Sequence, residues 1–486
     1  MILPRRNRFL SPVLVSLLWT TTSLPDRTPS SLAERIDPLL EEPCLRGARI
    51  GFRVQSLADG RILYDRNGTR PLAPASNLKI FTAAAALKVL GPAYRFPTTF
   101  HALDPIESGT LKGPLFLKGW GAPDLVAESW WWMTQELRRL GLRRVEGDLV
   151  LDDTYFDRKL RPDGWPPAVV DRAYNAPVSA LACNFGVVTV RVVPGRTTGD
   201  PPAVHLIPFR GHFQVTEEVV TRPGRSRVSV IRHPANGRTR IRVSGSLPPG
   251  GSPWESLHAV DDPTQYAGHA FRDLAREAGI EIGGSVRTGI VPPEAIEIYR
   301  HLSKPLAEIV GDMNKHSNNF VAEMLVKGMA VAGSDRPGTT ETGVGVVRRV
   351  LSEQGVALEG VGIRDGSGLA DGNLATAAAL ADTLVRFGRE FEVFPELVAS
   401  LPVAGTDGTL EDRDAGGALR RRVRAKTGFL RRVESLSGYA GAPGGEILAF
   451  SLLVNEAPCG HGQVTDLLDR VAAAIADGPG AGAGGD

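Results

Sequence analysis

Three short motifs, separated by long stretches of chain, constrain this 486-residue sequence more than any other feature. In chain order they are Ser76-Asn77-Leu78-Lys79, Ser317-Asn318-Asn319 and Lys426-Thr427-Gly428. Each pattern alone is common in long chains. Together they supply a hydroxyl nucleophile, an amine that can act as a base, a second hydroxyl beside an amide, and a cation on a strand. A fold that uses all three must bring distant parts of the chain into one cleft.

The first motif stands at the predicted start of a helix. Residues 76–90 are rich in helix-forming residues, and Gly91-Pro92 is a typical termination signal. A spacing of three places Ser76 and Lys79 one turn apart on the same face. Lys79 can act as a base near neutral pH only if its pKa falls from about 10.4 to about 7, which burial, the positive helix terminus and the second cation Lys426 all favour. The alternative is a serine that caps the helix, with a solvated lysine one turn later.

The second motif interrupts a predicted helix, because apolar residues with helical spacing lie on both sides of it. Ser317 and Asn319, two residues apart on a turn between helices, can both face a cleft. His316 is an alternative partner for a serine nucleophile. However, no acidic residue is recognisably placed to orient it, and Lys79 already fills the role of base. We therefore interpret His316 as a neighbour of the turn.

The third motif lies on a predicted strand over residues 422–428, which ends in a glycine where another segment can approach the backbone closely. Further strands are predicted over residues 433–439 and 446–454, so an antiparallel meander is expected. A lysine ammonium and a threonine hydroxyl on an edge strand suit a ligand that ends in a carboxylate. The alternative is that Lys426 only protects the edge of the sheet.

The motifs and their flanking segments resemble those of the low-molecular-mass class C penicillin-binding proteins, the D-Ala-D-Ala carboxypeptidases and endopeptidases of peptidase family S13. The resemblance spans about residues 45–455 and is carried by residues 74–79, 147–153, 174–181, 365–369 and 404–410. Ser317 follows Ser76 by 241 residues, whereas β-lactamases and short carboxypeptidases keep these two serines much closer. The long interval is similar to the extra domains that class C members insert into a transpeptidase-like fold.

The resemblance implies an α/β (α+β) multidomain fold with a β-lactamase- and transpeptidase-like catalytic domain, an antiparallel sheet with helices, and a large, mostly β insert. Residues 33–97 and 301–475 are expected to form the catalytic domain, and residues 98–300 to form two inserted domains. Alternating apolar residues predict strands within the insert at residues 187–192 and 227–231.

The resemblance also implies a serine-type D-Ala-D-Ala carboxypeptidase that trims peptidoglycan stem peptides, with opening of cross-links as a further option. In this mechanism Lys79 takes the proton of Ser76, which attacks the carbonyl of the penultimate D-alanine. Ser317 and Asn319 pass a proton to the leaving amine and hold the substrate amide, and water then hydrolyses the acyl-enzyme. Penicillin and other β-lactams are expected to bind covalently as inhibitors. No cofactor or metal is implied.

The same resemblance assigns substrate binding to the third motif and its neighbours. Lys426 and Thr427 hold the terminal carboxylate. Phe429, directly after Gly428, departs from the family, which usually has Thr or Ser there. Its backbone N–H still serves the oxyanion hole, worth roughly 3–4 kcal/mol, but a hydroxyl that helps to hold the substrate is lost. Asp152 matches the position at which class C relatives contact the third side chain of the stem, the alternative being a strand-end aspartate that caps a turn.

Two other functions remain open at this point. One is a β-lactamase or esterase of the same fold, against which stand the long insert and the lack of a recognisable acidic loop for fast deacylation. The other is a non-catalytic protein that binds peptidoglycan or β-lactams. The net charge of +2 and an aromatic content of 6% give no nucleic-acid footprint. Oligomeric state has no sequence signal.

The termini and the cysteines indicate export. Basic residues followed by an apolar run predict a signal peptide over about residues 1–24, too short for a membrane span, although retention as an anchor is an alternative. The expected location of the exported protein is the periplasm or the extracytoplasmic face of the cell envelope. The glycine-rich residues 476–486 predict a disordered tail. Cys44 precedes the first strand and Cys459 follows the last. If these strands are antiparallel neighbours, the two sulfurs lie at the same end of the sheet, and a disulfide between them is one option, with Cys183 as a buried thiol; other pairings stay open.

Overall fold

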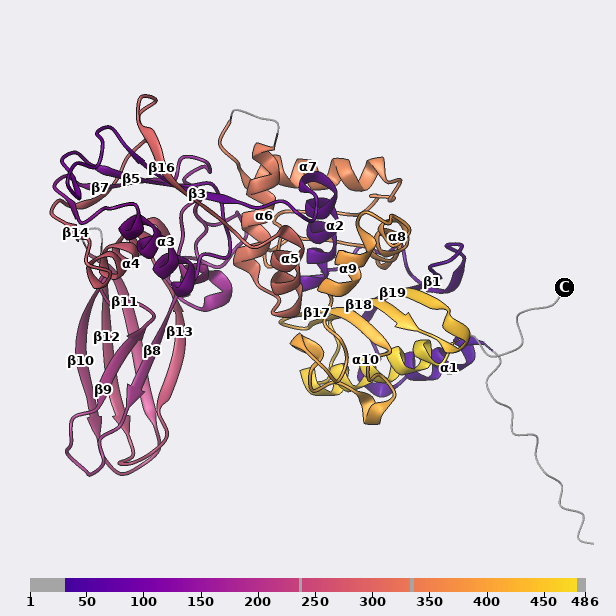
Figure 1. Cartoon of the computed structure of the whole chain (residues 1–486). Helices are drawn as coiled ribbons and strands as arrows, with labels where there is room; N and C mark the ends of the chain where they lie inside the picture. The colour runs from indigo at the N-terminus through magenta and orange to yellow at the C-terminus, as the bar shows by residue number, and fades with distance from the viewer. Residues whose placement is uncertain (1–30, 236–237, 333–335, 479–486) are drawn as a thin grey trace, which may run out of the picture.

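The computed structural model describes residues 31–235, 238–332 and 336–478, so the predicted signal peptide and most of the predicted tail lie outside the described residues. The molecule has two lobes (Figure 1). Segments from near both ends of the chain build one lobe, which we call the catalytic lobe, and the central part of the chain builds the other, which we call the insert lobe. Over the described ranges, no helix combines the length and the apolar character needed to cross a membrane.

A five-stranded antiparallel sheet organises the catalytic lobe. Its order is β17 (Val423–Leu430), β18 (Val433–Gly441), β19 (Ile447–Asn455), β1 (Arg49–Ser56) and β2 (Ile62–Arg66). The last three strands of the chain form the predicted antiparallel meander, and β17, which carries the third motif, lies at the edge. Because β1 pairs with β19, the N-terminal and C-terminal parts of the lobe share one sheet.

The described residues contain ten α-helices. They are α1 (Leu32–Leu40), α2 (Lys79–Leu90), α3 (Ala127–Arg139), α4 (Pro263–Glu277), α5 (Leu306–Lys315), α6 (Asn319–Val331), α7 (Thr340–Glu353), α8 (Ala377–Phe387), α9 (Phe394–Ser400) and α10 (His461–Ala476). The sheet is covered on both faces, since α1 and α10 pack on one side and α8 on the other. Accordingly, alternate residues of β19 enter different cores: Phe450 and Leu452 join α1 and α10, whereas Ala449 and Leu453 join α8.

Helix α2 lies at the centre of the catalytic lobe (Figure 1). Every residue from Lys79 to Leu87 is buried, as a helix with apolar residues all around it requires. The helix follows a 3₁₀ turn, Ala75–Leu78, and ends at Gly91, whose φ of +81° closes it. The helix predicted from the sequence is therefore confirmed, and its complete burial sets the environment of Lys79.

The insert lobe contains four sheets. A mixed five-stranded sheet has the order β15 (Val286–Thr288), β7 (Leu149–Asp152), β5 (Leu115–Gly119), β3 (Pro97–Ala102) and β16 (Ile296–Leu302). The three smaller sheets are β10 (Phe213–Thr221), β12 (Arg238–Leu247) and β11 (Arg227–Ala235); β13 (Trp254–Ala259), β8 (Val187–Val193) and β9 (Ala203–Ile207); and β14 (Glu281–Ile282), β6 (Arg144–Val145) and β4 (Thr110–Leu111). Helices α3 and α4 pack against each other beside them. The strands predicted at residues 187–192 and 227–231 are confirmed as β8 and β11.

The disulfide that the sequence left as an option is present. Cys44 and Cys459 are bridged, with 5.3 Å between their Cα atoms and 415 residues between them in sequence. The antiparallel register that pairs Arg49 with Asn455 brings the start of β1 and the end of β19 to the same end of the sheet, which explains why the two sulfurs meet. Cys183 is a buried free thiol, as predicted, and burial raises its pKa.

The bridge should contribute measurably to stability. Cys459→Ser should lower the free energy of unfolding by about 2–5 kcal/mol, because the bridge closes a very long loop of the unfolded chain. Denaturant unfolding of the oxidised protein measures this loss. Reduction should destabilise the wild-type protein by a similar amount and leave Cys459→Ser unchanged. Equal unfolding free energies for oxidised and reduced wild-type protein would contradict the expectation.

Candidate active site

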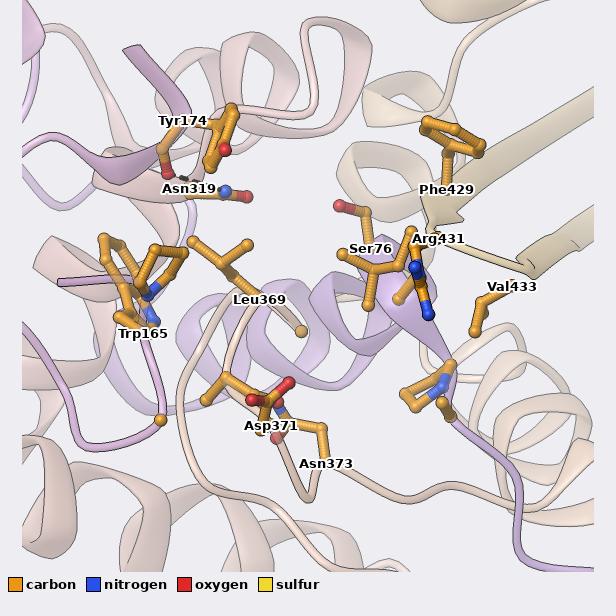
Figure 2. A pocket seen from close by; sticks show the side chains of 18 of the residues that line it. Ser76, Trp165, Tyr174, Asn319, Leu369, Asp371, Asn373, Phe429, Arg431 and Val433 are labelled. Atoms are coloured by element: carbon orange, nitrogen blue, oxygen red, sulfur yellow. Dashed lines mark hydrogen bonds between the residues drawn. The ribbon is translucent and has the colours of Figure 1, made fainter. Parts of the chain in front are cut away.

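The three motifs lie around one cavity of about 970 Å³. Ser76, Ser317 and Asn319 line it, together with Phe429, which follows the third motif. Figure 2 shows Ser76 and Asn319 directed into the same space from different parts of the chain. Residues that stand 241 positions apart in the sequence are therefore neighbours at this site.

The turn that carries Ser76 is held against the edge strand. The Asn77 side-chain amide donates a hydrogen bond to the Lys426 carbonyl oxygen of β17 (3.0 Å). The Ser435 hydroxyl of β18 donates to the Pro74 carbonyl oxygen (2.7 Å). Both bonds are buried, so they fix the position of Ser76 relative to the third motif.

Two glycines let the backbone pass close to this turn. A Cβ atom on Gly428 would lie 2.2 Å from Ser435 Oγ, and one on Gly368 would lie 1.9 Å from the Ala75 carbonyl oxygen. Gly368 also has a φ of +85°, which residues with a side chain rarely adopt. The close approach predicted at Gly428 is confirmed, and Gly368 provides a second one on the opposite side of the turn.

Lys79 is fully buried one turn after Ser76. Its Nζ lies 3.0 Å from Ser76 Oγ, 2.6 Å from Asn319 Oδ1 and 2.8 Å from the Ser367 carbonyl oxygen. The last two atoms can only accept hydrogen bonds, so a neutral amine gives its two hydrogens to them and keeps its lone pair for Ser76. Burial lowers the pKa of Lys79 to about 7, although the nearby Asp365 carboxylate acts in the opposite direction.

The second motif forms the turn between α5 and α6, and a segment of the insert lobe orients it. Asn319 Nδ2 donates to the Tyr174 carbonyl oxygen (3.0 Å), which leaves Oδ1 directed at Lys79 (Figure 2). Ser317 occupies the turn with a φ of +54°. His316 caps the C-terminus of α5 and is exposed, as expected for a neighbour of the turn.

The third motif places a second buried lysine beside the first. Lys426 Nζ donates to Ser317 Oγ (2.9 Å) and to the Thr427 carbonyl oxygen (2.9 Å), and the Thr427 hydroxyl donates to Thr409 (2.8 Å). Burial, and then the charge of Lys79, hold the pKa of Lys426 well below its usual value. Lys426 is fully buried and contacts the second motif, an arrangement that a charge serving only to protect the sheet edge does not require.

Phe429 forms part of the cavity rim rather than of the core. Its side chain is 56% exposed, and its ring centroid lies 4.2 Å from that of His461. His461 Nδ1 in turn pairs with Glu434 (2.5 Å) at the start of α10. The residue that departs from the family pattern thus contacts an imidazole ring at a tilt of 45° and presents an apolar side chain to the cavity.

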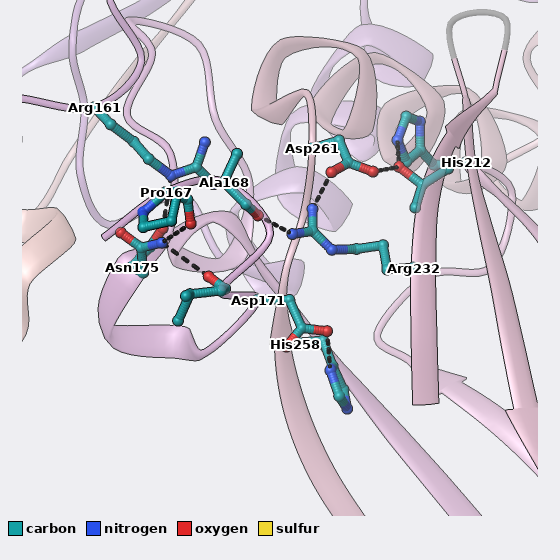
Figure 3. A network of polar contacts seen from close by, with 11 residues as sticks. Arg161, Pro167, Ala168, Asp171, Asn175, His212, Arg232, His258 and Asp261 are labelled. Atoms are coloured by element: carbon teal, nitrogen blue, oxygen red, sulfur yellow. Dashed lines mark hydrogen bonds and ion pairs between the residues drawn. The ribbon is translucent and has the colours of Figure 1, made fainter. Parts of the chain in front are cut away.

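A loop of the insert lobe, residues 161–175, forms one wall of the cavity and carries Trp165 and Tyr174. Polar contacts with the strands behind it hold this loop in place (Figure 3). They join Arg232 of β11 to the Ala168 carbonyl oxygen (3.0 Å) and His258 of β13 to Asp171 (2.8 Å). Within the loop, Asn175 Nδ2 donates to the Val170 carbonyl oxygen (2.8 Å). The position of the wall therefore depends on the sheets of the insert lobe.

Asp152 does not line this cavity. Its side chain at the end of β7 is fully buried, where it accepts hydrogen bonds from the Thr154 hydroxyl (2.6 Å) and the Val291 N–H (2.9 Å) and pairs with Lys118 (3.3 Å). Burial acts to raise the pKa of Asp152, but these hydrogen bonds and Lys118 outweigh it and leave the pKa below its usual value. The arrangement matches the alternative given for this residue, an aspartate that stabilises a turn after the strand.

Several cavity residues were not among the sequence-based candidates. Trp165, Asp371 and Arg431 line the cavity, but no local pattern distinguishes them. The carbonyl groups of Tyr174 and Ser367 are backbone groups, which carry no side-chain signal. Tyr174 and Ser367 nevertheless lie within two of the segments that carried the family resemblance, residues 174–181 and 365–369, so the resemblance was the signal that could have identified them. Among the described residues, no three His, Cys, Asp or Glu side chains are grouped closely enough to hold a metal ion.

Comparisons of this chain with known proteins and structures all indicate the same protein family. The model of the D-Ala-D-Ala carboxypeptidase 3 (S13) family matches residues 32–475. The chain is 40% identical over 462 residues to a D-alanyl-D-alanine carboxypeptidase from an Actinomadura species, covering 91% of this chain and 84% of that protein. It is similar to the crystal structure of penicillin-binding protein 4 from Haemophilus influenzae, with a TM-score of 0.79 and 27% identity over 90% of this chain and 98% of that chain. The same protein complexed with a β-lactam matches with a TM-score of 0.72 and 26% identity, over 90% of this chain and 98% of that chain.

These matches span both lobes and confirm the predicted family and the predicted multidomain α/β fold. They agree with the arrangement of a serine hydroxyl, a buried amine and a cationic edge strand around one cavity. The chain therefore belongs to the D-Ala-D-Ala carboxypeptidase 3 (S13) family.

Proposed function

We propose that this enzyme removes the terminal D-alanine from peptidoglycan stem peptides through an acyl-enzyme on Ser76, and that the same site can open cross-linked stems. The observation that carries the proposal is the contact of Lys79 Nζ with Ser76 Oγ, at 3.0 Å, in a site where the other two partners of the amine only accept hydrogen bonds. A neutral Lys79 placed in this way can take the proton of Ser76 as the hydroxyl attacks a carbonyl.

The remaining steps use the other two motifs. The backbone N–H groups of Ser76 and Phe429 receive the developing oxyanion. Lys426 bridges to Ser317 at 2.9 Å, so this pair can deliver a proton to the leaving amine. A substrate carboxylate beside Lys426 and Thr427 would favour the protonated lysine, because an opposite charge offsets the effect of burial. Water then hydrolyses the ester on Ser76.

The two lobes take different parts in this proposal. Residues 33–97 and 301–475 act as the catalytic domain, and residues 98–300 act as inserted domains that supply the wall with Trp165 and Tyr174. We also propose that the enzyme works outside the cytoplasm, in the periplasm or at the extracytoplasmic face of the cell envelope, where its substrate and its Cys44–Cys459 disulfide would both be expected.

The cavity suggests which side chain of the stem it recognises. Asp371 and Arg431 both line it (Figure 2), and within the described ranges the side chain of neither forms an ion pair or a hydrogen bond, although the Asp371 backbone N–H donates to Gly164. A zwitterionic side chain such as that of diaminopimelate would bring an ammonium to Asp371 and a carboxylate to Arg431. Asp152, which already has its partners, remains in this proposal a residue that supports the fold.

The first prediction concerns the nucleophile and its base. Ser76→Ala should abolish both covalent labelling by benzylpenicillin and release of D-alanine. Lys79→Ala should slow acylation by about 10²–10⁴-fold, because general base catalysis is lost. Intact-mass measurements after incubation with the antibiotic report both effects. Labelling that persists in Ser76→Ala would contradict the proposal, and rapid turnover of bound penicillin by the wild-type enzyme would favour a β-lactamase.

The second prediction concerns pH. Lys79 acts as a base only when neutral, and its pKa is about 7, so the acylation rate should rise with pH through about 7 and then level off. Below that point, it should fall by about tenfold per pH unit. Acylation by a chromogenic β-lactam, followed between pH 5 and 9, measures the profile. A rate that stays constant across this range would exclude Lys79 as the base.

The third prediction separates Asp371 from Asp152. Asp371→Asn should raise KM for stem peptides that contain diaminopimelate by about twofold to fivefold, as expected for an exposed ion pair, and leave acylation by penicillin unchanged. Asp152→Asn should instead lower stability, because it leaves Lys118 without its buried partner. Peptide kinetics and thermal unfolding of both variants give the comparison. The assignment is wrong if Asp152→Asn alone raises this KM.

A further inference from the structure

A buried carboxylate, that of Asp365, contacts the loop that holds the Lys79 amine. Asp365 belongs to the segment between α7 and α8, and its side chain is fully buried. Its two oxygens accept five hydrogen bonds. The donors are Trp165 Nε1 (2.6 Å), Ser367 Oγ (2.7 Å), Gly368 N–H (2.8 Å), Asn373 Nδ2 (2.8 Å) and Ala370 N–H (3.2 Å). Such a complete set of donors fixes the loop 365–373, which forms part of the cavity surface.

This loop holds the amine of Lys79. The Ser367 carbonyl oxygen accepts from Lys79 Nζ at 2.8 Å, while the hydroxyl of the same residue donates to Asp365. On the other side of the loop, Gly366 N–H donates to Glu323 (3.0 Å) and the Gly366 carbonyl oxygen accepts from Thr82 of α2 (2.6 Å). The carbonyl that meets the base is therefore placed by a hydrogen-bonded frame with Asp365 at its centre.

Asp365 also joins the two lobes. Trp165 comes from the insert loop that forms the cavity wall, and its indole N–H is the shortest of the five donors to Asp365. The Trp165 side chain is buried, and the loop that carries it also supplies the Tyr174 carbonyl oxygen that orients Asn319. A single carboxylate thus connects the wall of the cavity to the backbone that contacts Lys79.

The charge of Asp365 has no conventional partner. None of the Lys, Arg or His side chains in the described ranges lies within ion-pair distance of it, although many of the other acidic residues have such a partner. The charged groups around the site are Lys79 and Lys426 on one side of the loop, and Glu323, whose pKa is raised to about 7 by burial and by Asp365, on the other. The Asp365 carboxylate is therefore separated from the Lys79 amine by a single residue, Ser367, which contacts both, and its negative charge acts on the amine.

We propose that Asp365 is a positioning residue for the reaction: it holds the Ser367 carbonyl group on Lys79, fixes the Trp165 wall against the catalytic lobe, and acts with its charge on the protonation of the base. This inference rests on the proposed function, because it assumes that Lys79 is the base. It assigns a role in catalysis to a side chain that does not touch the substrate.

The test is the pH profile of acylation by benzylpenicillin in the full-length Asp365→Asn enzyme. Without the negative charge, the protonated form of Lys79 is less favoured, so the rise of the acylation rate should move to lower pH. The maximal rate should also fall by about 10- to 100-fold, because the frame around the Ser367 carbonyl group is disturbed. A purely structural role would lower stability without moving the profile.

Glu323→Gln is the matched control, since Glu323 is also fully buried and contacts the same loop. The pKa of Lys79 is shifted by burial and by Asp365, with Glu323 not among its causes, so the profile should stay at the wild-type pH. The proposal is overturned if folded Asp365→Asn keeps the wild-type profile and rate, or if Glu323→Gln shifts the profile equally. Absence of acylation in the wild-type enzyme would instead refute the proposed function itself.

A second variant covers the case in which Asp365→Asn does not fold. Ser367→Ala removes one donor to Asp365 but retains both the carboxylate charge and the carbonyl that contacts Lys79. Its acylation rate should fall by about 3- to 10-fold with the profile at the wild-type pH. A folded Ser367→Ala enzyme that acylates at the wild-type rate would overturn the proposal.

Discussion

The burial of one amine controls the rest of this structure. Lys79 has no access to solvent, so each of its hydrogen-bond partners must come from the protein. The three partners belong to three separate segments: the turn before α2, the start of α6 and the loop after α7. Those segments meet around α2, which runs through the lobe because its residues 80–87, nearly all apolar or small, are buried on every face of the helix. The requirement for a low pKa and the requirement for a dense core are therefore met by the same helix.

The edge strand and the insert lobe complete this arrangement from opposite sides. Strand β17 contacts the Ser76 turn through a glycine, where any side chain would collide with Ser435 or Pro74. The insert lobe contacts the site through two groups of one loop, the Tyr174 carbonyl and the Trp165 indole. The loop in turn is held by residues of strands β11 and β13. The insert thus acts as a support for catalytic groups as well as a wall, which gives a physical reason for its size.

Local patterns predicted the parts of the structure in which sequence neighbours make the contacts. The spacing of Ser76 and Lys79 gave their shared helix face, the alternation within residues 433–454 gave the meander, and the places of Cys44 and Cys459 beside paired strands gave the bridge. The frame around Asp365 and the true surroundings of Asp152 could not be predicted in this way. Most donors to Asp365 lie in its own loop and Thr154 is close to Asp152, but these groups follow no helical or strand periodicity. The remaining partners, Trp165 for Asp365 and Val291 and Lys118 for Asp152, come from distant segments that only the assembled fold brings together. The full burial of Lys426 also depends on neighbours that no strand pattern reveals.

The bridge between Cys44 and Cys459 has a consequence for the integrity of the chain. It joins points near the two ends of the catalytic lobe, and 415 sequence positions separate them. The polypeptide between these points is a closed covalent ring, from which the insert lobe extends as one large excursion. A protease that cuts the ring once, at any surface loop, therefore produces two fragments that stay linked, and the pairing of β1 with β19 holds them in register. The bridged protein therefore stays one covalent molecule after a cut that would divide an unbridged chain.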